Sequence, residues 1–125
     1  IDTTRRALEI GIAEAKPGAH IGDIGAAIQR YAEGEGFGVV RELVGHGVGR
    51  AVHEDPEVPN WGKQGTGPEI IEGMVLALEP MITIGSPRVK VSSDGWIWST
   101  QDGKNSAHFE HTILITHTGA KVLTV

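Results

Sequence analysis

The sequence predicts an α+β domain in which two amphipathic helices pack on one face of a twisted antiparallel sheet. Two observations lead to this fold class. Apolar residues recur at helical spacing before Gly36, whereas the chain after Gly38 consists of short apolar runs separated by glycine-bearing turns. Helices that come before the strands, and do not alternate with them, indicate that the helices gather on one side of an antiparallel sheet.

The size and composition fit one globular domain that spans residues 1–125. The chain is 39% hydrophobic and 22% charged, with a net charge of -5, which is unlike a disordered or membrane protein. Its 11 lysines and arginines form no basic stripe, so we expect no nucleic-acid partner. No apolar run approaches the roughly eighteen residues that span a bilayer, and there are no cysteines. We therefore expect no membrane association and a cytoplasmic location.

The first helix is predicted over residues 3–16. Asp2 offers an N-cap oxygen before it, and Pro17 ends it. The second helix ends at Gly36 and carries Asp23 near its positive end. Its buried stripe is predicted to consist of Ile21, Ile24, Ile28 and Tyr31.

The strands follow the second helix. They are predicted at residues 39–44, 74–84, 89–91, 96–100, 107–116 and 121–125. Residues 93–95 are the turn of a predicted hairpin, and residues 63–73 are predicted to be a surface connection. The stretch 45–56, which contains three glycines and two histidines, is predicted to be a loop.

This stretch, GHGVGRAVHEDP, concentrates residues that can carry chemistry. His46 and His53 are seven positions apart, so they cannot share one helical face as the histidines of a zinc-protease helix do. A metal held here takes its other ligands from distant segments. We expect the glycines of this stretch to let the backbone approach a metal and a substrate closely.

Two acids interrupt the apolar strands. Strand periodicity places Glu79 on one face with Val75 and Ala77, and it places Glu110 on one face with His108. Because neither strand contains a lysine or arginine, the carboxylates are exposed, paired with a distant arginine, or bound to a metal.

A histidine and two carboxylates suit Mn, Fe, Co or Zn. The chemistry then expected is hydrolysis, in which a metal-bound water attacks and Glu79 takes the proton. His53 would be a neighbouring acid or hydrogen-bond donor.

Four motifs carry a family resemblance. GHGVGRAVHEDP, the LEPM of residues 78–81, the DGW of residues 94–96 and the FEHT of residues 109–112 resemble, in order and spacing, the C-terminal half of a type I methionine aminopeptidase. The resemblance covers essentially the whole chain. It implies half of a pita-bread (creatinase/aminopeptidase) fold, two divalent metals bridged by a water or hydroxide, and removal of N-terminal methionine from nascent peptides.

The resemblance also implies roles for individual residues. His46 would ligate the first metal, Glu79 would ligate that metal and accept the proton, and Glu110 would bridge both metals. His53 would contact the scissile amide and stabilise the tetrahedral intermediate. The residues placed near the methionine side-chain pocket are Val52, Trp96 and His108. In such enzymes phenylalanine often stands at the position of Val52, and glutamine often stands at that of His108.

The family's remaining metal ligands, two aspartates, lie in an N-terminal half that has no counterpart here. Because the chain begins at Ile1 and helical sequence follows at once, we expect a fragment. Alone it would hold at most one metal ion, weakly, and would have little activity. The apolar face left open would be covered by the missing N-terminal half or by a second copy in a homodimer.

Other readings stay open. A prolidase or aminopeptidase P-like peptidase and a non-catalytic pita-bread binding module share the implied fold. The EPM and EHT strings favour the methionine enzyme, and the presence of His46, Glu79 and Glu110 argues against a binding module. Among the other candidate side chains, a structural or solvated role is expected for His20, His111 and His117. Trp96 and Trp98 share a face, so packing competes with a pocket role.

Overall fold

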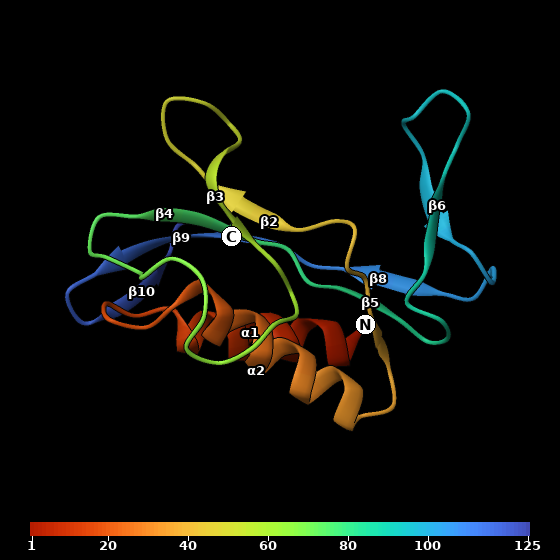
Figure 1. Ribbon diagram of the computed structural model, residues 1–125, viewed down its shortest axis with the longest axis horizontal. Coiled ribbons are helices and arrows are strands. Elements are labelled where there is room, and N and C mark those ends of the chain that lie inside the picture. Colours follow the sequence, from red (N-terminus) through yellow and green to blue (C-terminus); the bar gives the residue numbers. More distant parts are fainter.

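The computed structural model describes residues 1–125 and confirms the α+β class (Figure 1). Helices α1 (Asp2–Glu14) and α2 (Ile21–Gly34) lie together on one side of the strands. The strands are β1 (Gly38–Val39), β2 (Gly45–Gly47), β3 (Glu54–Val58), β4 (Val75–Leu78), β5 (Met81–Thr83), β6 (Val89–Val91), β7 (Trp98–Thr100), β8 (Ser106–His108), β9 (His111–Thr116) and β10 (Gly119–Val122). No helix is long and apolar enough to cross a membrane.

The main core lies between the helices and a five-stranded sheet of order β10-β9-β4-β2-β3. Leu76 and Leu78 of β4 and Ile113 and Ile115 of β9 are almost completely buried in this core. Because side chains alternate along a strand, the other side chains of β4, which include that of Ala77, face away from the helices. The sheet face opposite the helices is therefore the one that continues toward Glu79.

Two predicted strands are each broken in two. Residues 74–84 form β4 and β5, and residues 107–116 form β8 and β9. β4 pairs with β9 in the five-stranded sheet, while β5 pairs with β8 in a three-stranded sheet of order β1-β5-β8. The single strand predicted at residues 74–84 is broken because Pro80 lacks the amide hydrogen that would continue the ladder. The single strand predicted at residues 107–116 is broken opposite it, where the pairing changes from β5 to β4.

The prediction of a loop over residues 45–56 is also wrong at both ends. β2 lies between β4 and β3, and β3 includes Pro56. A Cβ on Gly45 would collide with the carbonyl oxygen of Ala77, and one on Gly47 would collide with that of Asp55. These two glycines thus allow close approach of neighbouring strands, whereas we had expected close approach to a metal and substrate.

Two segments project from the side of the sheets opposite the helices (Figure 1). One is the loop between β2 and β3, in which Val52 is 74% exposed, and the other is the β6–β7 hairpin, in which Trp96 is 85% exposed. Trp96 precedes β7 and is not part of it, and the strand predicted at residues 39–44 shrinks to the two residues of β1.

Asp23 fixes the start of α2. One carboxylate oxygen accepts a hydrogen bond from the backbone N–H of His20 at 2.7 Å, and the other accepts one from Gly65 at 2.7 Å. His20, expected in a solvated loop, is the N-cap residue. The hydrogen bonds from His20 and Gly65 hold the pKa of the Asp23 carboxyl below its ordinary value. Burial opposes this effect, and the charges of His20 and Lys16 add to it.

We expect Asp23→Ala to lower the free energy of unfolding by about 1 kcal/mol at pH 7 because the capping interaction is lost. A carboxyl with a lowered pKa stabilises the fold above its unfolded pKa of about 3.9 and loses this effect as the pH falls through the folded pKa. Urea unfolding from pH 7 to pH 3 should therefore show the two proteins converging in acid.

The matched control is Asp2→Ala, which removes only an exposed pair with Arg5 and should change stability by less than about 0.5 kcal/mol. A constant difference between the Asp23 variant and the wild type down to pH 3 would refute the assignment.

Candidate functional site

Glu79 lies between two histidines at the break that separates β4 from β5. Its Oε1 is 3.0 Å from Nε2 of His46, and its Oε2 is 3.4 Å from Nε2 of His108. The Glu79 and His46 side chains are largely buried, at 15% and 14% exposure, whereas that of His108 is 46% exposed. Each carboxylate oxygen of Glu79 therefore faces an imidazole nitrogen.

The strand register explains why these residues meet. His46 pairs with Ala77, two residues before Glu79, and His108 pairs with Met81, two residues after it. Side chains two apart along a strand point to the same side. His46 and His108 thus approach Glu79 from the neighbouring strands of the two different sheets.

Glu110 joins this group from the matching break between β8 and β9. Ligand atoms of Glu79, His108 and Glu110 all lie within 4.8 Å of one another. Since Leu78 pairs with His111 and Met81 pairs with His108, residues 79–80 face residues 109–110 where the two sheets meet. The two acids singled out by strand periodicity therefore come together.

Glu79 and His108 each stabilise the charged form of the other. The hydrogen bond from His108 lowers the pKa of the Glu79 carboxyl; burial opposes this effect, and the charges of His46, His108 and His53 add to it. The same hydrogen bond raises the pKa of His108, with burial again opposing it and the charges of Glu79 and Glu110 assisting. Glu79 is consequently an ionised carboxylate at neutral pH.

His53 and Val52 lie on the exposed loop before β3, beside this group. The ring centroids of His53 and His46 are 4.0 Å apart. A cavity of about 330 Å³ is lined by His46, Val52, His53, Glu79 and Glu110, together with Val48, Ala77 and Thr112. The structure thus brings five of the seven predicted site residues to one cavity.

A second cavity, of about 210 Å³, lies on the other side of His108. Most of its wall is apolar and comes from Val40, Leu43, Met81, Val89, Trp98 and Ala107. Trp98 lines this cavity, whereas Trp96 lines neither of the two. Met81 stands within the LEPM motif and Trp98 shares the predicted face of Trp96, so both carried a signal in the sequence.

Asn60 is a residue of the site region that sequence reasoning missed, and no pattern marks it. It is 1% exposed, and its Nδ2 donates a hydrogen bond to the backbone carbonyl of Glu79 at 2.9 Å. Its Oδ1 is buried without a hydrogen-bond partner. Asn60 therefore fixes the backbone at the break that carries the central carboxylate.

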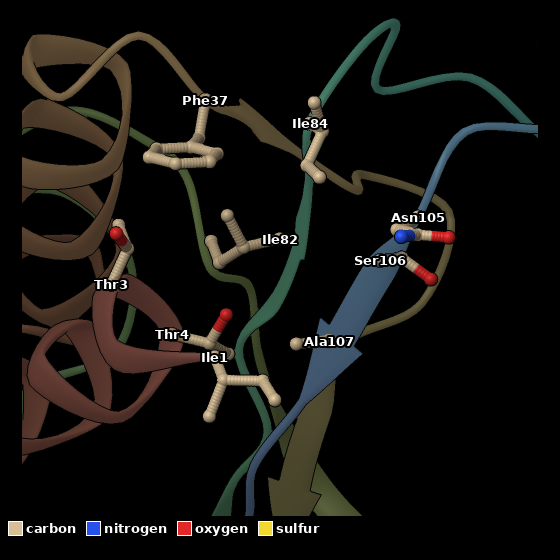
Figure 2. Close-up of a pocket in the computed structure, with 9 residues that line it drawn as sticks. All are labelled: Ile1, Thr3, Thr4, Phe37, Ile82, Ile84, Asn105, Ser106 and Ala107. Atoms are coloured by element: carbon tan, nitrogen blue, oxygen red, sulfur yellow. The ribbon is translucent and has the colours of Figure 1, made fainter.

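A third cavity, shown in Figure 2, serves as a contrast. It has a volume of about 260 Å³ and lies between the start of α1 and strands β5 and β8. Its lining includes Ile1, Phe37, Ile82 and Ile84 and contains no histidine, aspartate or glutamate. This cavity offers no metal ligand and no general base.

The donor geometry at Glu79 fits a divalent ion. Two atoms bound to one ion at about 2.1 Å lie about 3.0 to 3.4 Å apart for tetrahedral or octahedral angles. The two histidine nitrogens lie at 3.0 Å and 3.4 Å from the carboxylate oxygens. Imidazole and carboxylate donors suit Zn, Fe, Co and Mn.

Comparison with known proteins decides the family. The sequence profile of metallopeptidase family M24 matches residues 1–117. The chain belongs to this family. A divalent metal is implied by the family, and the histidine and carboxylate group described above is the part of the chain that fits one.

Several proteins similar to this M24 chain are named methionine aminopeptidases. Methionine aminopeptidase 1 of Bacillus subtilis is 52% identical over 124 residues, which are 99% of this chain and 50% of that protein. The crystal structure of methionine aminopeptidase from Thermotoga maritima superimposes with a TM-score of 0.97 at 52% identity, covering 99% of this chain and 50% of that one. The chain spans about half the length of these relatives, and its fold is one half of the pita-bread fold.

The prolidase alternative is less similar. The prolidase structure from Pyrococcus horikoshii has a TM-score of 0.73 at 27% identity and is covered to 30% of its length. The remaining histidines lie away from the candidate site. His111 bonds Thr124 through Nδ1 at 2.8 Å, and the side chain of His117 is 79% exposed.

We expect Asn60→Ala to lower the free energy of unfolding by about 1 to 3 kcal/mol because a buried carbonyl loses its donor. Equilibrium urea unfolding followed by circular dichroism measures this cost. Asn105→Ala is the control, since Asn105 is exposed and should unfold like the wild type. Equal stabilities of the two variants would show that the Asn60 hydrogen bond does not hold the break.

Proposed function

We propose that this chain carries the C-terminal half of the active site of a metal-dependent methionine aminopeptidase, which removes N-terminal methionine from nascent peptides. The observation that carries the proposal is the position of Glu79 at the junction of the two sheets: it lies 3.0 Å from His46, its ligand atom lies within 4.8 Å of that of Glu110, and all three residues line one cavity. The names of the relatives at about half identity favour this reaction over that of a prolidase or aminopeptidase P. A non-catalytic binding module has no need of such a group.

In this proposal His46, Glu79 and Glu110 hold a divalent ion, which is Co, Mn, Fe or Zn, and the complete site holds two such ions. A bound ion lowers the pKa of its water and polarises the scissile carbonyl. Glu110 stands within reach of both Glu79 and His108, which supports its role as the bridging carboxylate. The support for Glu79 as a ligand is its position against His46 at 3.0 Å.

The chain's own residues would then divide the remaining work. Glu79 takes the proton of the attacking water, and its place between His46 and His108 beside Glu110 supports this role. His53, exposed beside His46, donates a hydrogen bond to the scissile amide and stabilises the tetrahedral intermediate.

We also propose where the methionine side chain is held. The mostly apolar cavity lined by His108 and Met81 suits an unbranched apolar side chain, and His108 connects it to Glu79, which is 3.4 Å from its Nε2. Val52 and Trp96 lie on the two segments that project above the site. In this proposal they lie near the methionine side-chain pocket, as the resemblance implies.

The proposed complement of this chain, taken as a single domain of residues 1–125, is the other half of the enzyme. The relatives are about twice as long as the chain, and no helix covers the sheet face opposite α1 and α2 (Figure 1). The missing half would supply the remaining ligands. A second copy of this chain is the rival occupant, and a cytoplasmic location stays a prediction.

A chimera tests the function. We expect the N-terminal half of the Bacillus subtilis relative, joined to this chain, to release methionine from Met-Ala-Ser in the presence of Mn²⁺ or Co²⁺, whereas the chain alone should release almost none. Glu79→Gln and Glu110→Gln should each lower kcat/KM at least about 100-fold because the ion loses a carboxylate. Released methionine is measured by chromatography.

The matched control is Glu72→Gln, since the Glu72 side chain is 62% exposed and should leave kcat/KM unchanged. A folded chimera that binds the metal but releases no methionine would refute the proposed function. Robust release by the chain alone would refute the assignment of half a site.

The oligomeric state of the isolated chain distinguishes the N-terminal half from a second copy of the chain as the partner that covers the sheet face opposite the helices. Exposed apolar side chains such as Val52, Trp96 and Ile97 lead us to expect dimers of the isolated chain in sedimentation velocity at micromolar concentration. Adding the N-terminal half should convert these dimers into a one-to-one complex. A chain that remains monomeric throughout the micromolar range would exclude the homodimer.

A further inference from the structure

His108 occupies a position that the methionine pocket alone does not explain. It is the last residue of β8, its Nε2 is 3.4 Å from Oε2 of Glu79, and one of its ring nitrogens lies within 4.8 Å of a carboxylate oxygen of Glu110. One side of its ring lines the apolar cavity, while its nitrogen belongs to the carboxylate group. We propose that His108 is itself a ligand of the divalent ion in this chain, a role that rests on the proposed function.

The distances favour a ligand over a simple ion pair. A charge-assisted hydrogen bond from a nitrogen to a carboxylate is about 2.7 to 2.9 Å long, and the His108–Glu79 separation is 3.4 Å. Two donors of one ion lie about 3.0 to 3.4 Å apart. The separation is therefore long for the hydrogen bond between these two groups, and it falls within the range for two donors of one ion.

With His108 as a ligand, this chain alone supplies enough donors for one divalent ion. Catalytic zinc sites use three protein ligands and leave one position open for water. Glu79, His108 and Glu110 already supply three donors within 4.8 Å of one another, and His46 lies against the same Glu79. The chain therefore holds one divalent ion by itself, without any ligand from the other half and more tightly than His46, Glu79 and Glu110 would hold it alone.

The side-chain exposures fit this arrangement. Glu79 is 15% exposed and His108 is 46% exposed, so an ion enters from the solvent side past His108 without opening the core. No lysine or arginine is paired with either Glu79 or Glu110 in the structure. The negative charge of the two carboxylates is consequently available to a cation.

The first test is calorimetric titration of the 125-residue chain with Mn²⁺, Co²⁺ and Zn²⁺. We expect one site per chain, and we expect His108→Gln to weaken binding at least about 10-fold. His46→Gln should weaken it comparably, whereas His117→Gln, at an exposed histidine outside the site, should bind like the wild type. Circular dichroism confirms that each variant is folded.

The second test reads the imidazole directly and needs no variant. In ¹⁵N-labelled chain loaded with Zn²⁺, Nε2 of a ligand histidine loses its proton and takes the chemical shift of a metal-bound nitrogen. We expect this change for His46 and His108 and not for His117. The measurement separates a ligand from a histidine that only orients Glu79, because the latter keeps its Nε2 proton.

The metal-binding tests of His108 can fail without contradicting the activity test of the chimera. If His108→Gln binds metal like the wild type, or Nε2 of His108 stays protonated with Zn²⁺ bound, the inference is overturned while the proposed function stands. A folded wild-type chain that binds no ion also overturns it, and the activity of the chimera then decides the proposed function separately.

Discussion

The junction between the five-stranded and three-stranded sheets determines where the side chains of the candidate site lie. There, the turn away from the five-stranded sheet at Glu79–Pro80 faces the return from the three-stranded sheet at Phe109–Glu110. The backbone N–H of Phe109 donates a hydrogen bond to the carbonyl of Pro80 at 3.3 Å. Because both strands leave the ladder at the same level, two carboxylates emerge at one point.

Holding two carboxylates together costs free energy through burial and mutual repulsion. The fold offsets part of this cost with imidazoles on both sides of Glu79 and with the Asn60 hydrogen bond to its backbone. Gly45 allows β2 to approach β4 closely enough for His46 to reach Glu79. A divalent ion would offset the rest of the free-energy cost of holding the two carboxylates together. The geometry of the junction is in this way linked to metal-dependent chemistry.

Strand periodicity and local motifs predicted part of this arrangement from the sequence. Alternation placed Ala77 and Glu79 on one face of their strand and marked Glu79 and Glu110 as unusual; in the structure Leu76 and Leu78, on the other face, belong to the main core and Ala77 does not. The junction itself was not predictable, because a switch between sheets depends on which strands pair. Pro80 was its one local signal, and Asn60 gave none, since its importance comes from a residue 19 positions away.

The central claim is that His46, Glu79 and Glu110 hold a divalent ion at the junction. Anomalous diffraction from crystals of the chain soaked in Mn²⁺ tests it most directly, because the Mn signal locates the ion without any assumption about activity. We expect a single strong peak at about 2.0 to 2.3 Å from Nε2 of His46 and from carboxylate oxygens of Glu79 and Glu110. A peak at the exposed acids Glu54 and Asp55, with none at the junction, would contradict it.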